Sequence, residues 1–259
     1  MPVMRVHIKR VPDGKITLQE TSKIAIITIN RPAARNALTA NMWGELARLG
    51  RLAGQSSKAK VILLRGTPGQ FTAGADIKEF CEMSIEEAEQ TFQQMEEAIR
   101  VFENVPMPVV AVVDGPAMGA GFILSLACDM RVGTANAKMG IPVGKLGITI
   151  GPSFLRRIIR LIGPSRATEL IYTGKVIEAQ EALRIGLLNQ LLPSEDLDKA
   201  VLSLAGTIME QSGAVLRAVK KAAQLSQWKQ EEPWSFVDPV DFPEGCLAFA
   251  EKRKPRFST

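Results

Sequence analysis

The sequence predicts an α/β protein with a largely parallel sheet and a helical C-terminal part. Two short apolar runs, Val61–Arg65 and Pro106–Val113, each lie between stretches with helical periodicity. Short apolar strands that alternate with helices are typical of parallel sheets covered on both faces. From Ser153 onward the pattern is helical. With 259 residues, of which 46% are hydrophobic, the chain can form one large domain, or one domain with a helical appendage.

The N-terminal segment predicts three strands. Arg5–Lys9 and Lys15–Glu20 flank a Pro-Asp-Gly turn at residues 12–14, which indicates a β-hairpin. Lys23–Asn30 is rich in β-branched residues and ends at Arg31-Pro32, so it predicts a third strand. The single histidine, His7, would lie on the first strand, where a structural or surface role is expected.

Helices are predicted between and after the central strands. Apolar spacing predicts a helix that begins near Thr39. Its buried face would carry Met42, Leu46, Leu49 and Ala53. An acid-rich stretch from about Ser84 to Glu103 predicts a second helix.

The C-terminal third predicts a series of helices. Ser153 can cap the first one, which would end at Gly163 before Pro164 opens the next. Later helices are expected at about Glu178–Ile185, Glu195–Glu210, Gly213–Gln227 and Pro243–Lys252. Gln230–Pro243 contains three prolines and is interpreted as a connection. We expect a boundary near residues 190–200, which divides the chain into a core (1–195) and a helical part (196–259).

Composition excludes several classes of site. One histidine cannot supply a multi-histidine metal site, and Cys81, Cys128 and Cys246 form no Cys-x-x-Cys pair, so no metal is expected and the thiols are interpreted as reduced. The net charge of +5 and few aromatic residues argue against nucleic acid. The longest uncharged stretch, Gly115–Cys128, has 14 residues, too few to cross a membrane. No signal peptide is visible, and a cytoplasmic location is expected.

Two segments combine a buried strand, a small-residue turn and a helix. Val61–Arg65 leads to Phe71–Glu79, and Pro108–Val113 leads to Asp114–Phe122. Small residues allow close backbone approach, and helix N-termini present unpaired N–H groups. Two facing turns could place two donors on one oxygen, as in an oxyanion hole, although for either motif alone the glycines are explained by tight turns and close helix packing. Neither turn has dinucleotide or P-loop spacing, so no such cofactor is expected.

Six motifs, in this order, resemble the enoyl-CoA hydratase/isomerase (crotonase) superfamily. They are Asn30-Arg-Pro with Asn36-Ala-Leu, Phe71-x-Ala-Gly-Ala-Asp-Ile-Lys-Glu, the segment 108–121, Ala127-Cys-Asp, Gly144-Lys-Leu-Gly-Ile, and the segment 248–257. The resemblance implies a crotonase-like spiral of ββα repeats (the ClpP/crotonase fold) with C-terminal helices that support trimers, often paired into hexamers. It also implies a coenzyme A thioester as the substrate, with no separate cofactor.

The resemblance assigns roles to individual positions. It implies that the backbone N–H groups of Ala73 and Ala120 hold the thioester oxygen, on which enolate charge develops. Other implied substrate-binding residues are Arg35, Ala37, Leu38, Ala75, Asp76, Ile77, Gly119, Ile123, Val143, Phe249 and Lys252. Phe249 and Lys252 would approach the adenosine and phosphate end.

Two positions depart from the pattern of the family. A hydratase of this family adds water with two glutamates, at the positions of Ile123 and Val143 in this chain. General acid–base groups typically contribute about 10²–10⁴-fold, so ordinary hydration is doubtful. The sequence leaves open an acyl-CoA decarboxylase or isomerase, in which a thioester enolate forms without the glutamate pair. It also leaves open a non-catalytic acyl-CoA-binding subunit.

Several polar residues could replace the missing carboxylates, but structural roles are expected for them. Asp76 is interpreted as a helix cap, and Glu79 and Glu82 as a solvated face. Asp114 and Asp129 are interpreted as turn anchors, and Cys81 as a packed thiol. Arg156-Arg157 with Arg160, and Lys220-Lys221, are interpreted as solvated helix faces.

Overall fold

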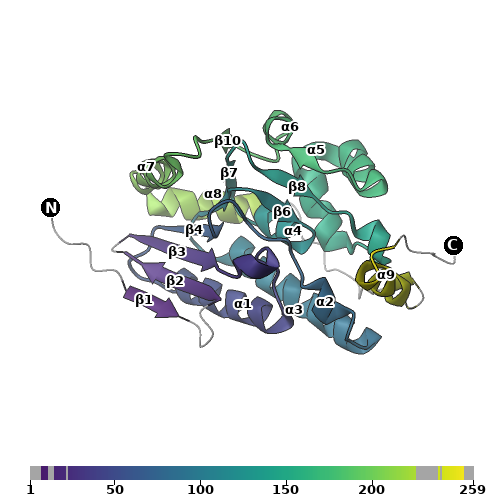
Figure 1. The fold of residues 1–259 in the computed structure, drawn as a ribbon. Coiled ribbons are helices and arrows are strands. Elements are labelled where there is room, and N and C mark those ends of the chain that lie inside the picture. The colour runs from purple at the N-terminus through teal and green to yellow at the C-terminus, as the bar shows by residue number, and fades with distance from the viewer. Residues whose placement is uncertain (1–6, 11–14, 22, 226–238, 240, 254–259) are drawn as a thin grey trace.

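The computed structural model describes residues 7–10, 15–21, 23–225, 239 and 241–253 (Figure 1). Its main sheet contains seven strands in the order β1-β2-β3-β4-β5-β7-β10. They are β1 (His7–Arg10), β2 (Ile16–Glu20), β3 (Ile24–Ile29), β4 (Val61–Gly66), β5 (Val109–Val113), β7 (Met130–Gly133) and β10 (Gln190–Leu191). The first three pair in antiparallel fashion, and β3 to β10 pair in parallel. The predicted antiparallel pairing of the first two strands and the parallel core are confirmed, whereas the predicted turn at residues 12–14 lies outside the described residues.

Alternate side chains of the central strands enter two different cores. Ile62 and Leu64 of β4 join the larger core, while Val61 and Leu63 join the smaller one. The larger core packs against α1 (Ala40–Gly54) and α3 (Ile85–Asn104), and the smaller one packs against α7 (Leu197–Met209). A strand buried on both faces needs apolar residues at every position, which explains the unbroken apolar runs in the sequence.

Helix α1 begins as the sequence predicts. The Thr39 hydroxyl accepts a hydrogen bond from the Met42 N–H, at 3.3 Å. The four residues predicted for the buried face, Met42, Leu46, Leu49 and Ala53, are all buried. Helix α3 begins with a capping box, in which Ser84 and Glu87 each bond the other's backbone N–H. A helix whose first turn is satisfied in this way begins at a fixed residue, and α3 borders the site described below.

A second sheet of three strands connects the central elements. It contains β6 (Pro116–Met118), β8 (Lys138–Gly140) and β9 (Ile177–Glu178). Helix α4 (Ala120–Leu126) begins one residue after Gly119, which follows β6. The 3-10 helix η2 (Val143–Leu146) follows β8. The short helix α2 (Ile77–Phe80) lies between β4 and α3.

The C-terminal helices follow the predicted order, with one correction. Helix α5 (Pro152–Thr173) is interrupted at Gly163, where φ is 75°, as the Gly-Pro pair predicts. The cap predicted at Ser153 is wrong: Gly151 is the N-cap, because Pro152 takes the first helical position and Ser153 is buried in the first turn. After α5 come α6 (Ala179–Arg184), α7, α8 (Gly213–Leu225) and α9 (Asp241–Ala250).

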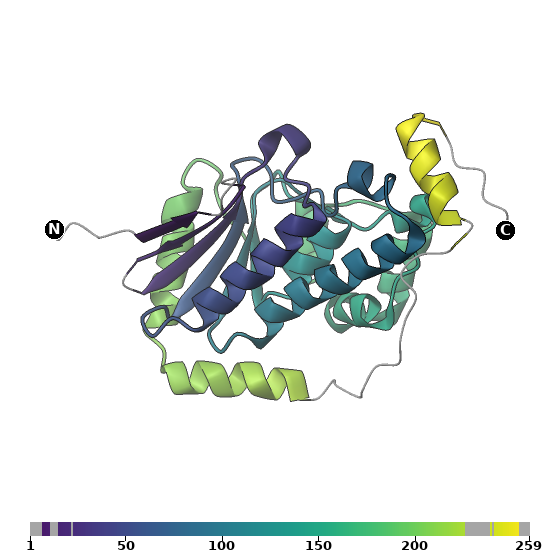
Figure 2. The same cartoon turned by 90° about the horizontal axis from the view of Figure 1, so that it is seen from below.

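Helices α8 and α9 lie at separate edges of the molecule (Figure 2). The predicted connection Gln230–Pro243 lies mostly outside the described residues, and its last three residues belong to α9. The division expected near residue 195 falls between β10 and α7 and stays a prediction. Within the described ranges, no helix combines the length and the apolar character needed to cross a membrane.

Candidate active site

The two small-residue turns predicted by the sequence lie side by side. The Thr72 N–H donates to Pro116 O at 3.1 Å, and the Met118 N–H donates to Thr72 O at 3.0 Å. These bonds join the turn that follows β4 to strand β6, which leads to α4. The two motifs therefore meet as the sequence predicts.

Gly74 makes this close approach possible. Its φ is 89°, which L side chains rarely adopt, and a Cβ atom there would lie 2.5 Å from Met118 O and 2.8 Å from Ala120 N. Only glycine satisfies both conditions. The main chain at Gly74 consequently lies directly against the first residue of α4.

Some backbone N–H groups in these two turns already donate a hydrogen bond, and others do not. The Ala73 N–H donates to Arg35 O at 3.0 Å, and the Gly74 N–H donates to the Thr72 hydroxyl at 3.0 Å. In contrast, the N–H groups of Ala75 and Ala120 donate to no acceptor within the described part of the chain. A donor already bonded to a backbone carbonyl cannot bind a substrate oxygen without breaking that bond. The Ala73 N–H, which the resemblance implies as a donor, is therefore occupied in this structure, and the unbonded N–H groups beside it belong to Ala75 and Ala120.

Both free N–H groups belong to residues that line a cavity of about 360 Å³. The turns supply Ala73, Ala75, Met118, Gly119 and Ala120 to its wall. The remaining lining residues are Arg35, Ile77, Phe80, Phe92, Met95, Ile141, Pro142, Val143, Leu146, Ile148, Thr149, Ile150, Phe154 and Phe249. No carboxylate, imidazole or thiol is among these described residues. The cavity can therefore bind and polarise a carbonyl group, but its side chains offer no strong base.

The structure brings most of the expected site residues to this cavity. Of the substrate-binding set, Arg35, Ala75, Ile77, Gly119, Val143 and Phe249 line it. Ala37 and Leu38 are buried behind the wall, where Leu38 exchanges backbone hydrogen bonds with Gly74 and Asp76. Ile123 is buried in α4, and Lys252 is exposed, so neither lines the cavity.

Asp76 has the structural role that the sequence predicts. Its carboxylate accepts the Lys78 N–H and so caps α2, and it pairs with Arg31 at 2.6 Å. The Glu79 carboxylate is not simply solvated, since it accepts the Ala40 N–H at 2.9 Å and so holds the start of α1. Asp114 and Asp129 anchor turns, as expected, by accepting the N–H groups of Gly69 and Val109.

Sequence reasoning missed the closed end of the cavity. Phe80, Phe92, Met95 and Phe154 all line it, and they come from α2, α3 and α5. Their spacing on amphipathic helices marks them as buried. It does not say which buried residues face a cavity, because that depends on how three helices from distant parts of the chain pack together.

Two cations that were expected on solvated faces are buried. Arg157 lies between two carboxylates, with Nε 2.7 Å from Glu103 and Nη1 2.8 Å from Glu96. Lys220 donates to Asp129 at 2.7 Å and to two backbone carbonyls. The predicted solvated faces are therefore wrong at these two positions, because each cation finds acceptors on elements that are distant in the sequence.

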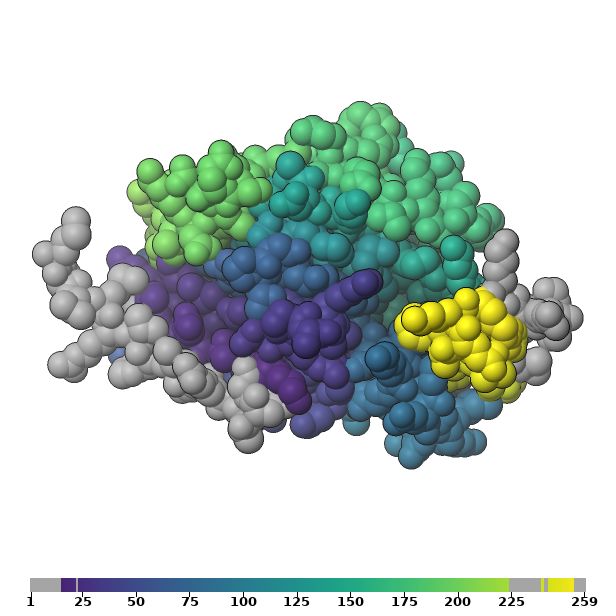
Figure 3. Space-filling view, viewed as in Figure 1, coloured from purple at the N-terminus to yellow at the C-terminus, as the bar shows by residue number. Residues whose placement is uncertain are grey.

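Helix α9 lies beside the cavity and carries Phe249 into its wall. Figure 3 shows α9 in yellow on the surface, beside the blue segment that contains α2 and α3. The ring of Phe242 contacts the ring of Phe80 edge-on, with centroids 6.0 Å apart. The thiols of Cys81 and Cys246 also lie close enough to shift each other's pKa. Three residues of α9 thus tie it to α2 and to the cavity.

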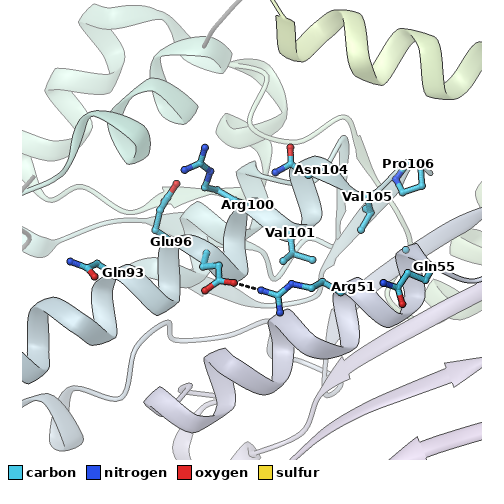
Figure 4. Close-up of a pocket in the computed structure, with 11 residues that line it drawn as sticks. Arg51, Gln55, Gln93, Glu96, Arg100, Val101, Asn104, Val105 and Pro106 are labelled. Carbon is cyan, nitrogen blue, oxygen red and sulfur yellow. Dashed lines mark hydrogen bonds and ion pairs between the residues drawn. The ribbon is translucent and has the colours of Figure 1, made fainter. Parts of the chain in front are cut away.

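A larger cavity, of about 660 Å³, lies between α1 and α3 and is not the candidate site. Its polar side chains largely pair with one another or with the core: Arg51 pairs with Glu97 (Figure 4), and Glu96 binds Arg157. None of the residues expected at the site lines it.

Comparison with known proteins identifies the family of the chain. The sequence model described as enoyl-CoA hydratase/isomerase matches residues 19–259. A crotonyl-CoA hydratase of Syntrophomonas wolfei is 34% identical over 252 residues, which covers 93% of this chain and 97% of that protein. The human mitochondrial methylglutaconyl-CoA hydratase is 34% identical over 253 residues, which covers 92% of this chain and 75% of that protein.

Solved structures agree with the sequence comparisons. The crystal structure of an enoyl-CoA hydratase/carnithine racemase from Magnetospirillum magneticum superposes with a TM-score of 0.80 at 30% identity, covering 97% of each chain. That likeness confirms the crotonase fold and the C-terminal helices. The chain belongs to the enoyl-CoA hydratase/isomerase family of acyl-CoA enzymes.

Proposed function

We propose that this chain stabilises the enolate of an acyl-CoA thioester through the N–H groups of Ala75 and Ala120, without a glutamate pair. The observation that carries the proposal is the cavity itself: it has two unbonded N–H groups at one wall and no carboxylate or imidazole among its described lining residues. Two preorganised donors on a developing oxyanion are each worth about 2.7–4 kcal/mol.

The reaction that fits such a site generates an enolate without a base. In a malonyl-type thioester, the bond between the α-carbon and the carboxylate breaks and CO₂ leaves. The electron pair passes into the thioester carbonyl, whose oxygen the two N–H groups hold. A proton from solvent then completes the acyl-CoA product. Val143 lines the cavity and Ile123 is buried nearby in α4, so hydration of a simple 2-enoyl-CoA is expected to be weak.

The test is direct mass detection of products from crotonyl-, 3-enoyl- and methylmalonyl-CoA. Decarboxylation of methylmalonyl-CoA without hydration of crotonyl-CoA is the expected result. Rapid hydration of crotonyl-CoA would refute the proposal. Binding of all three without any turnover would instead favour a non-catalytic acyl-CoA-binding subunit, a second function that the absence of carboxylates from the cavity wall supports.

Ala120→Pro tests the donor itself. Ala120 is the first residue of α4, a position that tolerates proline, so the N–H is lost while the helix is kept. The expected result is a fall in kcat of about 10²–10³ with a small change in KM. Ala120→Gly keeps the N–H and serves as the control, and an equal loss in both variants would contradict the role of the N–H.

Assembly is part of the proposal. A homotrimer, or a hexamer formed from two trimers, is supported by family membership and by two exposed valines of α8, Val215 and Val219.

A further inference from the structure

The cavity wall is graded from polar and exposed to apolar and buried. Arg35 and Thr149 are exposed, and half of the Phe249 surface is exposed, so these three residues mark the mouth. Phe80, Phe92, Met95 and Phe154 are at most 5% exposed, so they mark the closed end. Among the described residues that line the cavity, only Arg35 and Thr149 have polar side chains. One end of the cavity is therefore polar and exposed, and the other end is apolar and buried.

Charge follows the same gradient. Arg35, the one charged side chain that the described part of the chain contributes to the lining, belongs to the exposed group. Four apolar side chains form the closed end, so a carboxylate placed there would be desolvated without a cation to pair with it. Burial of an unpaired charge is strongly unfavourable. A charged acyl terminus is thus excluded from the closed end on electrostatic grounds.

The size of the cavity sets the length of its occupant. A water molecule occupies about 30 Å³ of the liquid, and a methylene group is of similar size, so about 360 Å³ holds roughly a dozen such groups. A four-carbon acyl group and its thioester would fill about half of that space. The rest of the cavity has apolar walls that would stay unused.

From this gradient we infer that the site binds an acyl group of about six to ten carbons whose tail, beyond the α-carbon, is uncharged and apolar and lies among Phe80, Phe92, Met95 and Phe154. The inference rests on the proposed function, because it places the thioester oxygen at Ala75 and Ala120. The coenzyme A moiety then leaves through the mouth beside Arg35. The chain length and the absence of a terminal charge distinguish this substrate class from crotonyl and methylglutaconyl groups.

Saturated acyl-CoAs test the inference because they lack a reactive double bond or a leaving carboxylate. Calorimetry would give the Kd of butyryl-, hexanoyl-, octanoyl- and decanoyl-CoA, with coenzyme A alone as the baseline. Each buried methylene is expected to tighten binding about four-fold (0.8 kcal/mol) until the closed end is filled. Octanoyl-CoA should therefore bind at least ten-fold more tightly than butyryl-CoA. Equal or weaker binding of octanoyl-CoA would overturn the inference.

The ω-carboxylated octanedioyl-CoA tests the charge. It has the same chain length as octanoyl-CoA and is expected to bind at least ten-fold more weakly. Equal affinity would show that the closed end accepts a carboxylate and would overturn the inference. If no acyl-CoA bound more tightly than coenzyme A, the proposed function itself would fail, and this outcome differs from acyl binding that is independent of chain length.

Met95→Phe shortens the closed end. We expect the octanoyl-CoA Kd to rise at least ten-fold while the butyryl-CoA Kd stays within two-fold. Met107→Phe is the matched control, since Met107 is also buried but lies outside the cavity wall. Thermal unfolding of both variants shows whether they fold. If Met95→Phe unfolds, the wild-type chain-length series still decides the question, and unchanged octanoyl binding in a folded variant would place the tail elsewhere.

Discussion

Burial sets the reactivity of the three cysteine thiols. Desolvation raises the pKa of Cys128 and of Cys246 to about 12 each, and the hydrogen bond to Cys81 adds to the effect at Cys246. Burial also raises the pKa of Cys81, which the hydrogen bond from Cys246 partly offsets. Because the thiolate is the reactive form, all three thiols are expected to react slowly or not at all at neutral pH.

The first prediction concerns these thiols. At pH 7 a thiol-specific colorimetric reagent should react slowly with the partly exposed Cys81 and not with the buried Cys128. The Cys81 rate should increase as pH rises toward its raised pKa, because deprotonation supplies the thiolate. Cys81→Ser should remove the slow reaction, and addition of denaturant should reveal the remaining thiols. Fast reaction of native Cys128 would contradict its burial.

Arg157 illustrates how a single buried cation supports the fold. Arg157→Met leaves Glu96 and Glu103 close together without their partner, and the loss of one member of a buried ion pair costs about 3–5 kcal/mol. We expect the free energy of unfolding to fall by about that amount in a denaturant titration. The triple variant with Glu96→Gln and Glu103→Gln should regain much of the loss, whereas no recovery would show that packing, and not charge, dominates at this position.

At the scale of elements, α9 packs against η2 through a close backbone contact at Gly245, in addition to its side-chain contacts with α2 and the cavity. A Cβ atom on Gly245 would lie 2.5 Å from the carbonyl carbon and oxygen of Leu146, in η2. Gly245→Ala is therefore expected to push α9 away from η2 and to move Phe249 out of the cavity wall. Loss of part of the burial of a Phe side chain costs about 1.4 kcal/mol, which corresponds to about a ten-fold rise in the Kd of octanoyl-CoA.

A second glycine provides the control for this prediction. Gly206 lies inside α7, and a Cβ atom there would meet no atom within 4 Å. Gly206→Ala should leave the Kd unchanged and raise the free energy of unfolding by about 0.5–1 kcal/mol, since alanine favours helices more than glycine does. An unchanged Kd in Gly245→Ala would show that α9 does not shape the site.

At the scale of the whole molecule, α8 carries two neighbouring exposed apolar side chains. Val215 and Val219 are four residues apart on one face of the helix and are 58% and 62% exposed. Exposed apolar residues that cluster in this way mark interaction surfaces. Light scattering should therefore give the mass of three or six chains. The double variant Val215→Asp with Val219→Asp should reduce that mass, and a wild-type monomer would contradict the proposed assembly.

The sequence predicts most of the fold because each element carries its own signal. Thr39 and Ser84 mark helix starts, Gly163-Pro164 marks a break, and the apolar runs of β4 and β5 require a sheet covered on both faces. It predicts the two turns of the site for the same reason. It could not predict the closed end of the cavity, the burial of Arg157, or which N–H groups are free. Each of these depends on contacts between segments that are distant in the chain, such as the bond from Ala73 to Arg35.

The two unbonded N–H groups of this site, at Ala75 and Ala120, belong to the main chain and not to side chains. They therefore depend little on which amino acid occupies these two positions. Every residue except proline carries a backbone N–H. Almost any codon change at positions 75 and 120 thus preserves both donors, provided that Gly74 keeps the two turns together. The side chains of Val143 and Phe154, in contrast, line the cavity directly, so substitutions there change its shape. Substitution of a lining side chain can therefore change which acyl group the cavity accepts. The two backbone N–H groups at positions 75 and 120 are kept through such changes.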